Sequence, residues 1–206
     1  MTKAIESTML FLKEKFLINE GDQKYRYRYE HTLRVAAIGQ QIAIKEGLNV
    51  EALVLGCLLH DIGYIQCNTE EDFNYHGRIS ARIAREFLES IQYSNEWIDT
   101  ICFGIYIHTE EKPEREPTPL EASIADADNI DRFDAYRLYE NLKYSAIEEM
   151  SQDEIAKMSM KRIARLEELM NYPFGTATGK EMWKDKLEFQ KSYYKRLLSQ
   201  MELTIN

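Results

Sequence analysis

The sequence predicts an all-α protein. Apolar residues recur at intervals of three and four along nearly the whole chain of 206 residues, as on one face of an α-helix. No segment shows the strict apolar/polar alternation of a half-buried strand, and no internal repeat or low-complexity tract divides the chain. The expected architecture is one helical domain with a C-terminal helical extension.

Two helices are predicted before the most apolar part of the chain. The turn at Asn19–Asp22 ends the first, whose apolar stripe is Ile5, Met9, Leu12 and Phe16. The second runs from Tyr27 to Glu46. At its start three tyrosines, Tyr25, Tyr27 and Tyr29, alternate with two arginines and are expected to pack at the rim of the core, with base stacking as the alternative. His31 shares a face with Val35, Ile38 and Ile42, so we expect it to point inward.

The segment Val50–Leu59 is too uniformly apolar for a surface helix and predicts a central buried one. This helix would deliver His60 and Asp61 at its C-terminal end. A polar loop is expected over Gln66–Asn74.

Two amphipathic helices are predicted next, at Gly77–Glu89 and Asn95–His108. His76 would lie near the N-terminus of the one and His108 near the C-terminus of the other. Thr109–Pro119 is acidic and holds three of the four prolines, which indicates a surface loop.

From Leu120 the pattern is helical through Asp128 and on to about Tyr144. Ser151-Gln-Asp-Glu154 is a capping box that opens a helix to about Met170. A turn-rich connector, Asn171–Gly179, precedes a last amphipathic helix to about Met201. The apolar stripes of these last helices fit burial within one chain or in a homodimer.

The predicted organisation is an N-terminal helix and connector over residues 1–24, a metal-binding core over 25–145 and C-terminal helices, packed on that core, over 146–206. The net charge of −9, with no dense basic stripe, argues against nucleic acid as a partner. The N-terminus does not resemble a secretory signal and no apolar run approaches the roughly 20 residues that span a bilayer. We therefore expect a cytoplasmic protein whose three cysteines are reduced packing residues.

The histidines are the most informative residues. There are only four, and acidic residues or turn signals flank most of them. An ionisable pair such as His60-Asp61 at the end of the most buried helix is costly unless a cation neutralises it. Asp128 lies one helical turn from Ile124 and shares its inward face, so we prefer it to Asp126 as a ligand. Asp126 and Asp131 are expected to act as cap or ion-pair residues.

His31, the His60-Asp61 pair and Asp128, in this order on helices, resemble the signature of the HD superfamily of metal-dependent phosphohydrolases. The resemblance spans about Tyr29 to Arg137. His76-Gly-Arg and Ile105-Tyr-Ile-His108-Thr are similar to two further motifs of the members that hold two metals, among them bacterial diadenosine-tetraphosphate hydrolases and cyclic-dinucleotide phosphodiesterases. The resemblance implies a first metal on His31, His60, Asp61 and Asp128, and a second on Asp61, His76 and His108.

Two departures refine this resemblance. The chain has Tyr64 where many of the phosphodiesterases have a lysine soon after the His-Asp pair, and it lacks their Gly-Tyr-Pro motif, which argues against cyclic-dinucleotide cleavage. The turn Gly175–Gly179 and the helix after it instead resemble small HD nucleotide pyrophosphohydrolases, some of which hold one metal. One or two divalent ions are therefore expected, from among iron, manganese, cobalt, nickel and zinc.

The resemblance implies hydrolysis of a phosphoester or phosphoanhydride bond in a small nucleotide, with Asp61 orienting the attacking water. Candidates to bind the phosphate are the arginines near the motifs: Arg78, Arg82, Arg132 and Arg137. The competing interpretation is that these arginines pair with the surplus acidic residues on solvated helix faces. For the whole protein, the alternatives are a catalytically inactive HD-fold module that binds a nucleotide or metal, and a helical scaffold.

Overall fold

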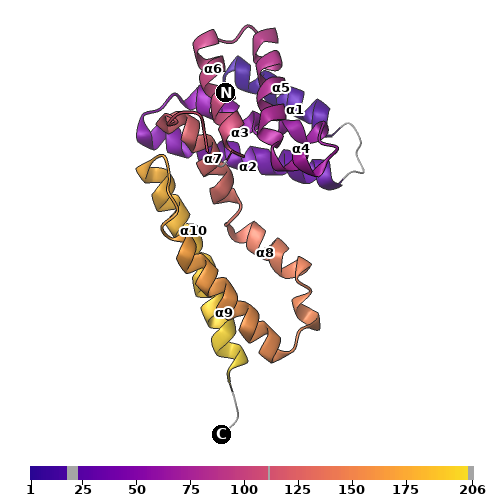
Figure 1. The fold of residues 1–206 in the computed structure, drawn as a ribbon, viewed down its shortest axis with the longest axis vertical. Helices are drawn as coiled ribbons and strands as arrows, with labels where there is room; N and C mark the ends of the chain where they lie inside the picture. Colours follow the sequence, from indigo (N-terminus) through magenta and orange to yellow (C-terminus); the bar gives the residue numbers. More distant parts are fainter. Residues whose placement is uncertain (18–22, 111, 204–206) are drawn as a thin grey trace. The chain divides into compact units, whose positions relative to one another are not determined.

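The computed structural model of the chain describes residues 1–17, 23–110 and 112–203. These residues form ten α-helices and two 3₁₀ helices and no strand (Figure 1), which confirms the all-α prediction. The predicted turn at Asn19–Asp22 lies outside the described residues. None of the described helices combines the length and the apolar character that a membrane-spanning helix needs.

The chain divides into two compact units. The first unit comprises Met1–Asp131 and Phe174–Gly179, and the second comprises Arg132–Pro173 and Lys180–Asn206. The first unit contains the 3₁₀ helix η1 (Ile62–Ile65) and seven α-helices: α1 (Lys3–Phe16), α2 (Gln23–Glu46), α3 (Val50–Leu59), α4 (Glu70–Asn74), α5 (His76–Ser90), α6 (Asn95–Ile107) and α7 (Pro119–Asp131).

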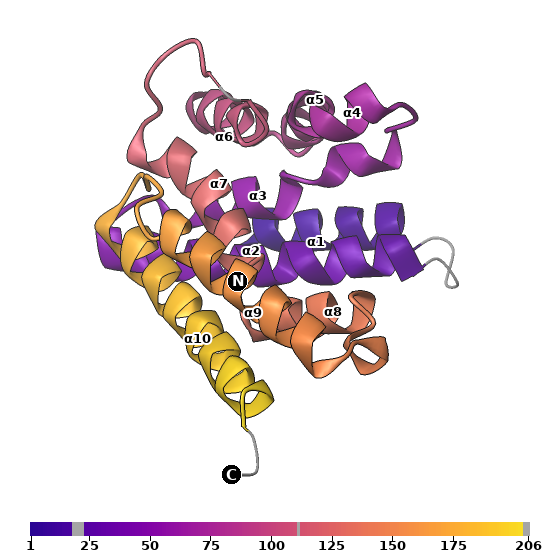
Figure 2. The same ribbon diagram turned by 60° about the horizontal axis from the view of Figure 1, so that its bottom comes forward.

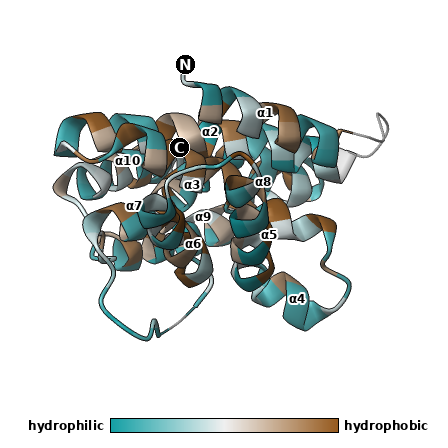
Figure 3. Ribbon diagram, turned by 90° about the horizontal axis from the view of Figure 1, so that it is seen from above, coloured by the Kyte–Doolittle hydropathy of each residue, from teal (hydrophilic) through white to brown (hydrophobic). Residues whose placement is uncertain are grey.

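Helix α3 is the centre of the first unit, as its composition predicted. Eight of its ten residues are buried, and it packs against α1, α2, α6 and α7 (Figure 2). The helices around it are amphipathic: α1 and α5 in Figure 3 carry both hydrophilic and hydrophobic residues. Asn49 begins α3 by accepting a hydrogen bond from the amide of Ala52 at 3.0 Å. Because Leu58 and Leu59 are buried, the C-terminal end of α3 lies in the packed core.

Two predicted connections contain more helix than expected. The loop predicted at Gln66–Asn74 includes α4, because Thr69 and Asp72 form a capping box in which each side chain accepts the other's amide hydrogen. The connector predicted at Asn171–Gly179 ends early, since α10 (Ala177–Met201) begins inside it. There the Thr176 hydroxyl accepts from the amide of Gly179 at 3.0 Å.

The second unit contains α8 (Ala135–Tyr144), η2 (Ile147–Glu149), α9 (Gln152–Leu169) and most of α10. The predicted capping box at Ser151 and Glu154 begins α9. Trp183 of α10 donates its indole N–H to the carbonyl of Leu169 at 2.9 Å, which joins α10 to the end of α9. The proposed boundary at residue 145, the packing of residues 146–206 on the core and a homodimer stay predictions.

Candidate metal centre

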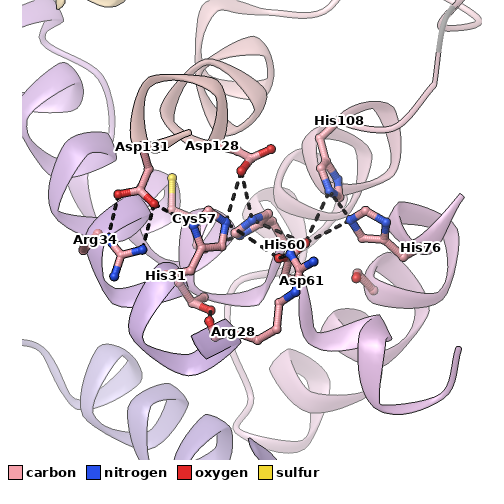
Figure 4. Close-up of polar contacts among 12 residues, drawn as sticks. Arg28, His31, Arg34, Cys57, His60, Asp61, His76, His108, Asp128 and Asp131 are labelled. Atoms are coloured by element: carbon pink, nitrogen blue, oxygen red, sulfur yellow. Dashed lines mark hydrogen bonds and ion pairs between the residues drawn. The ribbon is translucent and has the colours of Figure 1, made fainter. Parts of the chain in front are cut away.

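Six side chains converge at the centre of the first unit (Figure 4). Within the described part of the chain they form two groups, each with ligand atoms within 4.8 Å of one another. The first group is His31, His60 and Asp128; the second group is Asp61, His76 and His108. The structure thus brings together all six residues that the sequence nominated as metal ligands.

The first group comes from helices that pack along their length. His31 lies on α2, His60 directly follows α3, and Asp128 lies in the last turn of α7. Helices α2, α3 and α7 all contact one another. The side chains of His31 and His60 are 2% and 0% exposed, so the position of this group is fixed by the core itself.

The second group is assembled from helix ends. Asp61 follows α3, His76 is the first residue of α5, and His108 directly follows α6. Two glycines permit the close approach of these ends. A Cβ on Gly63 would lie 2.7 Å from the carbonyl oxygen of His76, and a Cβ on Gly77 would lie 2.8 Å from that of Ile105.

Hydrogen bonds at Nδ1 orient all four imidazoles. Three rings meet a main-chain carbonyl three residues earlier, at 2.5–2.8 Å: His60 with Cys57, His76 with Phe73, and His108 with Ile105. The fourth, His31, meets a carboxylate oxygen of Asp131 at 2.7 Å. Each of these oxygen atoms can only accept, so the hydrogen of the ring must be on Nδ1. A neutral imidazole carries a single hydrogen on its two nitrogens. In its neutral form each of the four rings therefore leaves Nε2 as an electron-pair donor.

These Nε2 atoms surround the two carboxylates. His31 Nε2 lies 3.1 Å from Asp128 Oδ1, and His76 Nε2 lies 2.9 Å from Asp61 Oδ1. His60 Nε2 lies between the carboxylates, 3.5 Å from Asp61 Oδ1 and 3.9 Å from Asp128 Oδ1. It is fully buried and has no hydrogen-bond partner among the described atoms. Leaving such an atom unsatisfied costs about 1–3 kcal/mol.

A bound cation would satisfy the Nε2 atoms that have no hydrogen-bond donor. His76 Nε2 and His108 Nε2 are 3.0 Å apart, and two lone pairs at that distance repel each other unless a proton or a metal ion lies between them. The buried Nε2 atom of His60 also requires a partner, because among the described residues it has neither a hydrogen bond nor solvent to satisfy it. Imidazole nitrogen together with carboxylate oxygen is a donor set that suits divalent transition metals. The residues present therefore fit such an ion in either group.

The electrostatics also favour a cation. Burial alone would raise the pKa of Asp61, but nearby His60, the close contacts with His108 and His76, and the charge of Arg28 hold it well below its usual range. Burial lowers the pKa of His60 to about 4, so this ring is neutral at pH 7. Burial opposes the charged form of His31 too, but the hydrogen bonds with Asp128 and Asp131 outweigh it and raise the pKa to about 9.

Arg28 is a residue of the site that the sequence analysis missed. Its Nη1 donates to Asp61 Oδ2 at 2.6 Å, and its guanidinium lies 3.7 Å from the ring centroid of Tyr64. The Tyr64 ring also contacts His76, at 4.3 Å between the ring centroids. The signal that could have found Arg28 is its position one helical turn before His31.

Two further aspartates of α7, Asp131 and Asp126, have different hydrogen-bond partners. Asp131 accepts from His31 and also forms an ion pair with Arg34, consistent with its predicted ion-pair role. Asp126 lies on another side of α7 and is also buried; its carboxylate accepts from the amide of Gly175 at 2.9 Å. Burial raises the pKa of Asp126 to about 7. Both faces of α7 are thus packed, and Asp128 is the one of the three that joins a ligand group.

Three of the four candidate arginines form ion pairs with glutamates in the structure. Arg78 donates two hydrogen bonds to Glu110, at 2.6 and 3.0 Å. Arg82 pairs with Glu86 at 2.9 Å. Arg132 and Arg137 belong to the second unit, where Arg137 pairs with Glu140. Their binding of phosphate stays a prediction.

All three cysteines are free, and Cys57 and Cys102 are buried, as predicted.

Comparison with known proteins agrees with this geometry. A model of the HD domain matches residues 28–133, just over half of the chain, and the chain therefore belongs to the HD domain family. An uncharacterized protein of Clostridium beijerinckii is 35% identical over 98 residues, which are 46% of this chain and 61% of that protein. The match thus spans less than two thirds of that relative's length.

Two solved structures share the fold. One is described as a predicted HD superfamily hydrolase from an uncultured Thermotogales bacterium, with a TM-score of 0.67 and 18% identity over 95% of this chain and 91% of that one. The other is described as an HD-superfamily hydrolase from Bacillus thuringiensis, with a TM-score of 0.69 and 17% identity over 98% of both chains. At these identities the likeness establishes the fold.

Proposed function

We propose that this protein is a metal-dependent phosphohydrolase that cleaves a phosphoester or phosphoanhydride bond, with a small nucleotide as the expected substrate. One observation carries the proposal: four imidazoles, each committed at Nδ1, turn their Nε2 atoms toward two carboxylates in a buried centre. Such an arrangement is costly without a cation. The fold shared with two proteins described as HD superfamily hydrolases supports a hydrolytic reaction.

The two groups offer places for one or two cations. A bound divalent ion supplies Lewis-acid chemistry, because it lowers the pKa of water and neutralises charge on phosphoryl oxygens. Asp61 can serve both groups: its Oδ1 lies 2.9 Å from His76 Nε2, and its Oδ2 lies 3.7 Å from His31 Nε2. This donor set suits one or two ions from among iron, manganese, cobalt, nickel and zinc.

Asp61 is the proposed catalytic residue. Its pKa is held well below the usual range, so its carboxylate is ionised at neutral pH and can accept a hydrogen bond from the attacking water. Arg28 donates to Oδ2 and fixes the plane of this carboxylate. The guanidinium of Arg28 has five N–H groups, of which one donates to Asp61, and another can donate to a phosphoryl oxygen. It is therefore a phosphate-binding candidate beside Arg78, Arg82, Arg132 and Arg137.

The test is phosphate release by the full chain from nucleoside mono-, di- and triphosphates and dinucleoside polyphosphates. Turnover is expected with added Mn²⁺ and is expected to vanish after chelation. Asp61→Asn should reduce turnover by more than about 100-fold, because even outer-shell partners of a metal site typically cost 10–100-fold. Glu121→Gln is the matched control, since Glu121 is a buried carboxylate paired with Arg115 outside both ligand groups.

The alternative function would give a different pattern. A catalytically inactive nucleotide- or metal-binding module would bind Mn²⁺ and a nucleotide but release no phosphate from any compound in the panel. Full turnover by the Asp61→Asn variant would contradict the role given to Asp61.

A further inference from the structure

We infer that Asp131 is a positioning residue: it fixes the His31 ring and strengthens the hold of the first group on a divalent cation. The inference rests on the metal-binding part of the proposed function and is independent of the reaction that the centre catalyses. Asp131 itself is not among the residues whose atoms form a ligand group.

His31 differs from the other three histidines in its Nδ1 partner. The partners of His60, His76 and His108 are main-chain carbonyls three residues earlier, which the local backbone supplies. The partner of His31 is a carboxylate 100 residues further along the chain, on another helix. The orientation of the His31 ring therefore depends on a side chain of another helix and not on the backbone of its own helix.

Asp131 is itself held in place (Figure 4). Arg34 donates from Nε to Asp131 Oδ1 at 2.8 Å and from Nη2 to Oδ2 at 3.1 Å. The Asp131 side chain is only 7% exposed, so this two-point contact is shielded from solvent on most sides. A carboxylate bound at both oxygens in a buried site has one available orientation.

Two neighbouring side-chain contacts connect α2 with α7. Arg34 lies three residues after His31 on α2, and Asp131 lies three residues after Asp128 on α7, so each pair shares a helix face. One link is the 3.1 Å contact from His31 Nε2 to Asp128 Oδ1. The other is the contact of Asp131 with His31 Nδ1 and Arg34. Both nitrogens of one ring are thus fixed from the same neighbouring helix.

The physical consequence is a stronger ligand. A carboxylate that accepts from the N–H of a ligating imidazole makes the ring more basic and fixes its direction. It also balances the positive charge that a bound cation places on the ring. The second group has only carbonyls behind His76 and His108. The first group should therefore bind a cation more tightly than the second.

The direct test is a zinc titration of metal-stripped full chain against a chelating indicator. Asp131→Ala is expected to weaken binding at the first group by about 10–100-fold and to leave the second group unchanged. Asp131→Asn keeps the volume and an oxygen that accepts from His31, so its loss should be smaller. Glu121→Gln, which removes a buried carboxylate from the same helix α7, should leave both affinities unchanged.

A second readout separates positioning from general stability. In zinc-saturated protein, NMR of labelled imidazoles should show a Nδ1–H of His31 that exchanges slowly with solvent, and Asp131→Ala should abolish the slow exchange at His31 alone. The inference is overturned if Asp131→Ala keeps wild-type zinc affinity and slow exchange, or if Glu121→Gln weakens binding as much. Neither measurement requires turnover, so an inactive enzyme would refute the proposed function without touching this result.

Discussion

The two ligand groups lie side by side but are positioned by different means. The first group sits where three helices pack along their length around a buried core, and a carboxylate backs one of its rings. The second group is formed by three helix ends, with main-chain carbonyls behind its rings and Arg28 on its carboxylate. A rigid core thus fixes one half of the site, while close contact between helix ends fixes the other. The two halves should therefore respond separately to mutation.

The largest effect is expected from removing one ligand of each group. His60→Ala should weaken cation binding at the first group by more than about 100-fold, and His108→Ala should do the same at the second, because a ligand matters more than its outer-shell partner. In a protein that holds two ions, each variant should keep one metal equivalent. Elemental analysis of zinc-loaded protein measures this. A His108→Ala variant that loses both equivalents would contradict the independence of the groups.

The first group should also depend on pH in a characteristic way. The raised pKa of His31, about 9, means that its Nε2 carries a proton at pH 7 in the metal-free protein, and this proton must leave before a cation binds. Apparent affinity should thus rise about tenfold for each pH unit up to about 9 and level off above it. His60, with its pKa lowered to about 4, is neutral throughout and contributes nothing to this change.

Chelator competition at several pH values gives the slope. Calorimetry in buffers of different ionisation enthalpy counts the released proton directly. An affinity that stays flat between pH 7 and pH 9 would mean that no proton leaves His31.

The smallest effect is expected from Gly77→Ala, which adds a methyl group between the start of α5 and the end of α6. In Gly77→Ala the new Cβ would lie 2.7 Å from Thr109 Oγ1 and 2.8 Å from the carbonyl of Ile105, so α5 must move away from α6. We expect a loss of about 1–3 kcal/mol in the free energy of unfolding and weaker binding at the second group, with the first group unchanged. Thermal unfolding and the same zinc titration measure both quantities.

Gly47→Ala is the matched control for that variant. Gly47 has a φ of +66° and open space around it, so alanine there costs roughly 1–2 kcal/mol through backbone strain without displacing a helix. Its unfolding free energy should fall while both zinc affinities stay as in the wild type. Equal metal loss in the two variants would attribute the effect of Gly77→Ala to general destabilisation.

Several features of the site followed from local sequence. The apolar run of α3 predicted a buried helix, and it does deliver His60 and Asp61 into the core. Helical spacing selected Asp128 over Asp126, because a side chain one turn from Ile124 must share its face. The ordered histidines and aspartates nominated all six members of the two groups. The loop predicted over Gln66–Asn74 was wrong in part, because the capping box of Thr69 and Asp72 begins α4 there.

The sequence alone therefore determined the helical class, through its periodicity, and nominated six candidate ligands, through motifs that resemble those of the HD superfamily. Only the tertiary structure decided that Arg28 contacts Asp61, 33 positions away, and that Asp131 contacts His31, 100 positions away. It also decided that Arg78 contacts Glu110, 32 positions away. The physical reason is that long-range partners are chosen by how whole helices pack, and no local pattern records which faces will meet.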